Sequence, residues 1–137
     1  MDLRIDPTDA VPIYAQVVDQ IKALIASRAL RPGDPMPSVR ELAVNLRINR
    51  NTASKAYQTL EAEGILASRQ GQGTVVAEGG APWSHEERVR RLERSLDRSI
   101  VEAYHLEIPF DEMPPILEER LKRFTPDDNR DKKEDPA

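Results

Sequence analysis

The chain has 137 residues, enough for one modest domain or for one small domain with an appendage. It lacks cysteine, which excludes disulfides and thiolate metal sites, and its net charge of −4 argues mildly against nucleic acid as a partner. No apolar run approaches the roughly 20 residues that span a bilayer. The first ten residues lack the apolar stretch of a secretory signal, so we expect a cytoplasmic protein with no membrane partner.

Two helices are predicted in the first third of the chain. Residues 12–28 form the first, with an apolar stripe at helical spacing made of Ile13, Val17, Ile21, Leu24 and Ile25. Three prolines and a glycine in RALRPGDPMPS then break it. Ser38 followed by Glu41 is a capping-box pattern, and it predicts the start of a short second helix over 38–46.

A third helix and a hairpin follow closely. Asn49 can cap the third helix, whose apolar stripe is Ala53, Ala56, Tyr57 and Leu60. Gly64 stands where a helix often ends in a left-handed residue. ILAS and TVVA read as two short strands joined by RQGQG, a glycine-bearing hairpin loop.

The remaining residues predict two more helices and a tail. Residues 84–106 carry one apolar stripe of Val89, Leu92, Leu96, Ile100 and Ala103, and a shorter helix is expected over 111–124. Residues 125–137 are charged and hold no apolar anchor, which favours a disordered tail.

Three helices followed by a two-stranded hairpin form a winged helix-turn-helix, so the predicted fold is mainly α with a small β-hairpin. Burying the stripe of the third helix turns polar side chains outward, led by Arg50, Asn51 and Thr52 at its start. A major groove admits one such helix, and residues 38–57 hold four basic side chains against Glu41 alone. Phosphate responds to that local charge rather than to the sum over the chain.

The stretches LRPGDPMPSVRELA, NRNTASKAYQTLE, EGIL and GQGTVV stand in one order at one spacing. Through them, positions 12–76 resemble the GntR family of bacterial transcription regulators. The resemblance implies that Arg40 and Arg50 contact DNA and that Gly71 and Gly73 let the wing tip approach a minor groove. Many relatives carry a second arginine where this chain has Ser54. The predicted DNA-binding residues are Ser38, Arg40, Asn49, Arg50, Asn51, Thr52, Ser54, Lys55, Arg69, Gly71, Gln72 and Gly73.

The segment after GGAPW is too short to enclose a metal-binding, acid-binding or enzyme-like domain. It resembles the YtrA-type branch of the family, in which a short helical arm makes the dimer. We therefore expect a winged helix-turn-helix domain at 11–79, a dimerisation arm at 80–124 and a disordered tail at 125–137. The predicted dimerisation residues are Val89, Leu92, Leu96, Ile100, Leu117, Leu121 and Phe124.

These features predict a homodimeric repressor that binds an inverted-repeat operator in double-stranded DNA. The alternative is a winged helix used for protein docking, with weak DNA binding that varies little with salt. An enzyme is disfavoured, since no nucleophile–base pair, metal cluster or cofactor loop is recognisable, and no cofactor is expected. A small-molecule effector stays open, because no group of polar residues marks a site for one.

Overall fold

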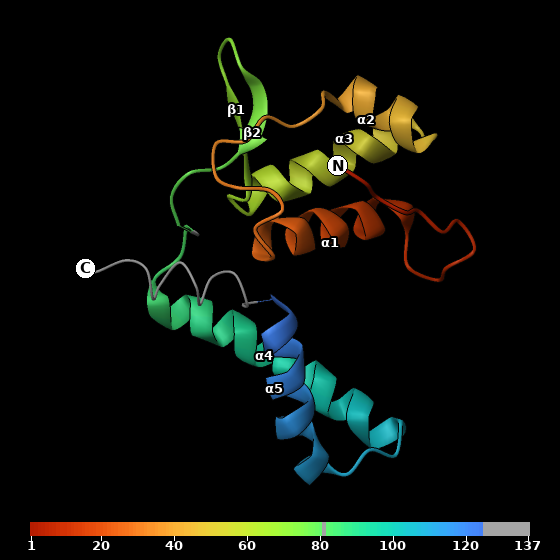
Figure 1. Ribbon diagram of the computed structural model, residues 1–137, viewed down its shortest axis with the longest axis vertical. Helices are drawn as coiled ribbons and strands as arrows, with labels where there is room; N and C mark the ends of the chain where they lie inside the picture. Colours follow the sequence, from red (N-terminus) through yellow and green to blue (C-terminus); the bar gives the residue numbers. More distant parts are fainter. Residues whose placement is uncertain (81, 125–137) are drawn as a thin grey trace. The chain divides into compact units, whose positions relative to one another are not determined.

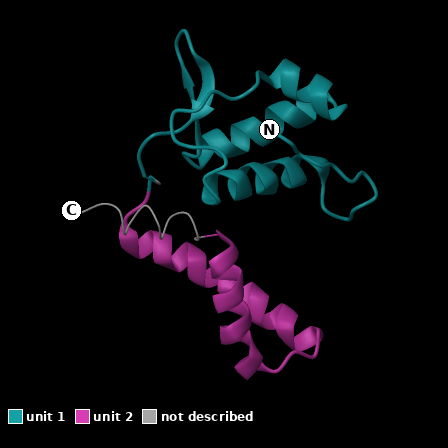
Figure 2. Ribbon diagram, viewed as in Figure 1, with its two compact units in different colours: residues 1–82 teal, residues 83–137 magenta. Residues whose placement is uncertain are grey.

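A computed structural model describes residues 1–80 and 82–124 (Figure 1). The chain divides into two compact units, Met1–Pro82 and Trp83–Ala137, shown in teal and magenta in Figure 2. The predicted disordered tail at 125–137 lies outside the described residues. Among those described, no helix is both long and apolar enough to cross a membrane.

The first unit is built on helix α3, Arg50–Ala62, against which α1, Ile13–Ala26, and α2, Val39–Leu46, both pack (Figure 1). The stripe predicted for α3 is buried, and Leu60 is fully inaccessible. It meets Val17 and Ile21 of α1 and Leu42 of α2 in one core. Because one aliphatic cluster closes all three helices, their mutual angles are fixed by packing.

Caps define where the short helices begin and end. Ser38 accepts the N–H of Glu41 at 3.0 Å and the Glu41 carboxylate accepts the Ser38 N–H, so the predicted capping box is present. Asn49 caps α3 by accepting the Asn51 N–H at 2.7 Å. Gly64 follows α3 in the left-handed conformation, as predicted.

The predicted hairpin consists of β1, Leu66–Arg69, and β2, Gly73–Val76, paired antiparallel. A third segment, which the sequence pattern did not predict, joins them from before α2. Gly33 donates to the Val76 carbonyl at 2.8 Å, and Met36 donates to the Thr74 carbonyl at the same distance. This pairing covers the outer edge of β2 and ties the base of the wing to the loop between α1 and α2.

Residues 1–10, outside the predicted winged helix-turn-helix domain, pack along α1. Leu3 is buried in the same core. The side-chain amide of Gln20 both donates to and accepts from the backbone of Arg4, at 2.7 and 2.8 Å. Gln16 pairs with Asp6 in the same way. Two glutamines one turn apart thus hold an extended segment against a helix.

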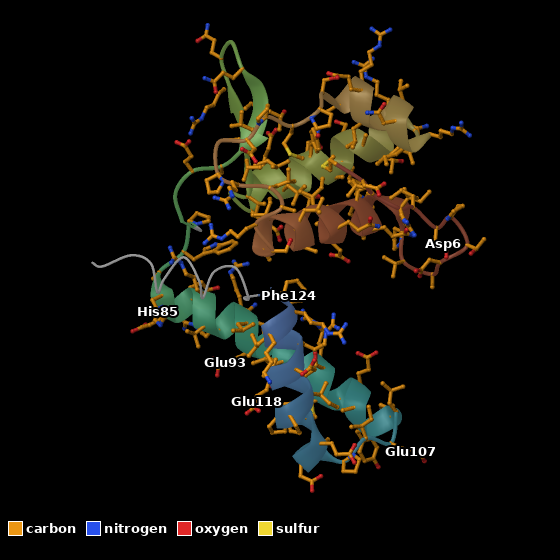
Figure 3. All side chains as sticks on the ribbon, in the orientation of Figure 1. Asp6, His85, Glu93, Glu107, Glu118 and Phe124 are labelled. Carbon is orange, nitrogen blue, oxygen red and sulfur yellow. The ribbon has the colours of Figure 1, made fainter. Side chains whose placement is uncertain are left out.

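The second unit contains α4, His85–His105, a single 3-10 turn at Phe110–Glu112 and α5, Met113–Phe124. Ser84 caps α4 by accepting the Glu87 N–H. Figure 3 shows His85 at the start of α4, Glu107 just beyond its end and Phe124 at the end of α5. Among the described residues of this unit, only Ala103 is a buried hydrophobic residue.

Candidate nucleic-acid interface

The start of α3 presents an exposed polar surface. Arg50, Asn51 and Lys55 are exposed, whereas Thr52 and Ser54 are half-buried beside the core stripe. The two leading base-contact candidates, Arg50 and Asn51, are thus exposed, while Thr52 lies closer to the core. The backbone N–H groups of a first helical turn have no partner within the helix and favour a nearby anion, although here Asn49 already accepts the N–H of Asn51.

Two of the predicted DNA-binding residues position helices as well. Ser38 and Asn49 use a side-chain oxygen to hold the first turn of α2 and of α3, respectively. The Tyr57 hydroxyl donates to the Pro37 carbonyl at 2.7 Å and so joins α3 to the residue before that cap. Burial, with the nearby carboxylate of Glu41 adding to it, raises the pKa of Tyr57 above its ordinary value.

Lys55 and Ser54 are engaged within the unit. The Lys55 ammonium lies 4.0 Å from the ring centroid of Tyr14 on α1, a cation–π contact. Ser54 accepts a long hydrogen bond of 3.4 Å from the Gln58 amide. Position 54 is thus half-buried and uncharged, and the cation of the adjacent Lys55 is directed toward α1.

An arginine outside the predicted set lies beside the start of α3. Arg40, Arg47 and Arg50 line one hollow of about 320 Å³, together with Ala43, Val44 and Ile48. All three arginines are exposed. The only sequence signal for Arg47 was the local excess of basic residues over positions 38–57.

The wing carries the other predicted contacts. Gly71 and Gly73 have φ of 81° and 73°, which glycine adopts without strain, and they fix the tight turn at the exposed tip. Gln72 is exposed between them. Arg69 pairs with Glu78 at 3.2 Å on the surface, so its guanidinium already has a counterion.

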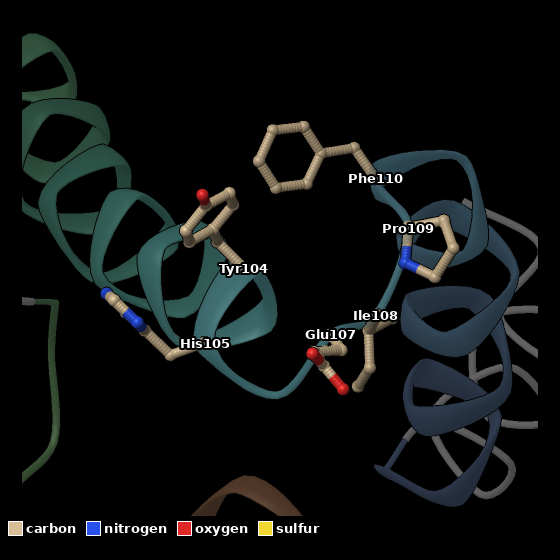
Figure 4. A pocket seen from close by; sticks show the side chains of 6 residues that line it. All are labelled: Tyr104, His105, Glu107, Ile108, Pro109 and Phe110. Atoms are coloured by element: carbon tan, nitrogen blue, oxygen red, sulfur yellow. The ribbon is translucent and has the colours of Figure 1, made fainter.

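The predicted dimerisation residues are all exposed, from 38% for Phe124 to 60% for Leu92. Further exposed hydrophobic residues that were not predicted lie in the same unit: Val101, Tyr104, Leu106, Phe110 and Ile116. A hollow of about 550 Å³ lies at the turn after α4, and Figure 4 shows Tyr104, Glu107 and Phe110 among the residues that line it.

A three-helix core, an exposed start of the third helix and a glycine-tipped hairpin define a winged helix-turn-helix DNA-binding protein. The family model for "Bacterial regulatory proteins, gntR family" matches residues 13–76. The HTH-type transcriptional repressor YtrA of Bacillus subtilis (strain 168) is 35% identical over 133 residues, which cover 97% of this chain and 99% of that protein. The chain belongs to the GntR family, and the predicted resemblance to its YtrA-type branch is confirmed.

Solved structures support the same fold. A transcriptional antiterminator from Listeria monocytogenes EGD-e matches with a TM-score of 0.76 and 28% identity, over 88% of this chain and 90% of that one. YtrA from Sulfolobus acidocaldarius, a GntR-family transcription factor, matches with a TM-score of 0.55 and 33% identity, over 88% and 97%. The chain is thus a DNA-binding transcription regulator rather than an enzyme, as predicted.

Proposed function

We propose that the chain is a repressor that binds an inverted-repeat operator as a homodimer. The exposed start of α3 is the observation that carries the proposal. Arg50 and Asn51 stand on a helix whose opposite face is fixed in the core, so their direction is set before DNA arrives. Arginine can bond guanine and asparagine can bond adenine, each through two contacts in the major groove.

Four of the other predicted DNA-binding residues fit supporting roles around α3. Arg40 lies beside Arg50 at the same hollow. The wing tip is exposed, and Gly71 and Gly73 have no side chains that would keep its backbone away from a minor groove. Lys55, held over Tyr14, would offer a cation to the phosphates along the groove.

The helical arm of residues 80–124 is proposed to join the two subunits. Leu96 and Ile100 are each 39% exposed one turn apart on α4, and Leu117 of α5 is 49% exposed. Exposed large apolar side chains in such number favour an interaction surface on this unit. A second copy supplies a self-complementary surface under two-fold symmetry, which also matches the symmetry of an inverted repeat.

A dimer that binds near a promoter would act as a repressor. The relative YtrA of Bacillus subtilis is named a transcriptional repressor, and it aligns over nearly the whole of both chains. A dimer bound near a promoter obstructs polymerase without any further activity. No small-molecule effector is assigned, since no polar constellation among the described residues marks a site for one.

The test is DNA binding by Arg50→Ala. Duplexes selected by the purified chain from a random-sequence library would serve as the probe. The variant should lose about 1–3 kcal/mol per subunit on its selected site and accept other bases at one position of each half-site. Alanine is the best helix former, so α3 itself should be retained, which thermal unfolding would check.

Two results would overturn the proposal. Equal affinity of the parent chain and Arg50→Ala for the selected duplex would remove the base-reading role. Weak binding that varies little with salt, with no sequence selected, would favour the alternative of a winged helix used for protein docking.

A further inference from the structure

We propose that Arg47 binds a backbone phosphate of the DNA strand bordering the groove that α3 enters. This contact would set the position from which Arg40 and Arg50 meet the bases. The inference rests on the proposed function and deepens it, because Arg47 is not among the DNA-binding residues predicted from the sequence. It is carried by the charges around the hollow and by the chemistry of the residues that line it.

The backbone at Arg47 favours a different residue. Arg47 ends α2 with φ 55° and ψ 46°, the left-handed conformation, while its N–H donates to the carbonyls of Ala43 and Val44. A side chain is disfavoured in that conformation, and glycine is the usual residue at such a helix end. The backbone therefore gives no reason for an arginine here, as it gives none at Arg28, so the case for the guanidinium rests on what surrounds it.

The charge around the hollow lacks a counterion. Arg40, Arg47 and Arg50 form no ion pair with any residue in the described part of the chain. Arg69 on the wing is different, since Glu78 already neutralises it. Three like charges around about 320 Å³ repel one another, and an anion between them relieves that repulsion. A phosphate also matches the planar guanidinium through two parallel hydrogen bonds.

The place and the lining of the hollow fit a DNA backbone better than a free ion. Arg47 stands two residues before Asn49, the cap of α3, and shares the hollow with Arg50 in the first turn of α3. A phosphate that borders a groove occupied by this turn would therefore come near Arg47. The apolar part of the lining consists of Ala43, Val44 and Ile48, and Val44 is 70% exposed. Apolar and cationic lining together suit a sugar ring with its phosphate, which combines apolar and anionic surface.

The test compares the parent chain with Arg47→Gly on the library-selected duplex. Glycine suits the left-handed position, so thermal stability should be unchanged or higher. DNA affinity should fall about ten-fold or more per subunit, as for loss of a hydrogen bond to a charged group. The slope of log affinity against log salt should decrease by about 0.9 per subunit, while base preference is kept.

Arg28→Gly is the matched control, because Arg28 is also a left-handed arginine, with φ 69°, but does not line the hollow. It removes the same charge and should leave affinity and salt slope unchanged. Arg47→Lys should retain the slope. If Arg47→Gly binds like the parent while Arg50→Ala is impaired, this inference is wrong and the proposed function stands. If the parent selects no duplex, both fail.

Discussion

The two units of the chain differ in how they treat apolar side chains. In the described residues, every buried hydrophobic residue except Ala103 lies in the first unit, from Leu3 to Val76. The second unit instead exposes most of the large apolar residues, including Leu92 and Leu117. The first unit therefore has a hydrophobic core of its own. The described residues of the second unit leave most of its large apolar side chains exposed, so these can be buried only by something else. The predictions below test this contrast.

The largest effect is expected from Leu60→Ala in the first unit. Leu60 is fully buried, so the variant should lose about 2–5 kcal/mol of unfolding free energy through lost burial and a new cavity. Leu92→Ala is the matched control in the second unit, where Leu92 is 60% exposed. Urea unfolding followed by circular dichroism would measure the free energy of unfolding of both variants, at a protein concentration low enough that no dimer forms. Similar losses in the two variants would remove the contrast between the units.

A smaller effect, confined to assembly, is expected from Leu96→Glu. If the arm joins two copies, each copy of the variant buries an unpaired carboxylate in the interface. The dissociation constant of the dimer should therefore rise roughly 100-fold or more. Sedimentation over a concentration series would measure it. Val11→Glu places the same charge on a residue of similar exposure in the first unit, 41% against 39%, and should leave assembly unchanged. A Leu96→Glu chain that dimerises like the parent would contradict the proposed arm.

The smallest effect is expected from Tyr57→Phe, which tests how firmly the first unit holds its own α2–α3 junction. The variant leaves the Pro37 carbonyl without its 2.7 Å partner and should lose about 1 kcal/mol at neutral pH. The pKa of Tyr57 is raised in the folded chain, so the stability that its neutral form contributes is present below about pH 10 and is lost as the pH rises further.

The pH series supplies the control for that variant. Denaturation at several pH values from neutral to strongly alkaline should show the difference between parent and Tyr57→Phe shrinking above about pH 10. A difference that stays constant across the range would show that the hydroxyl is not held in its neutral form by the fold.

Helices, hairpin and the outward face of α3 could be predicted because each has a local signature. Apolar spacing located α1 and α3, and the side chains of Ser38 and Asn49 marked the two helix starts within one residue. These signals work at short range, because a cap or a stripe depends on neighbours only a few positions away.

Two features could not be predicted, because they depend on residues far apart in the sequence. The glutamine pairs that hold Arg4 and Asp6 follow no periodic pattern, so Leu3 was not recognised as a core residue. Gly33 pairs with Val76 across the fold. A third unpredicted feature is local: α2 ends at Leu46 as predicted, but the left-handed residue that follows is Arg47, where glycine would be the usual residue.

The Arg69–Glu78 pair on the wing has a consequence for selectivity. A phosphate that approaches the wing has to displace a carboxylate, so one counterion is exchanged for another with little net gain. If the wing contacts DNA as proposed, it favours a duplex whose shape fits the hairpin over a polyanion that offers charge alone. Long-range attraction then comes from Arg40, Arg47 and Arg50 around the hollow, and RNA or heparin should compete poorly for the hairpin.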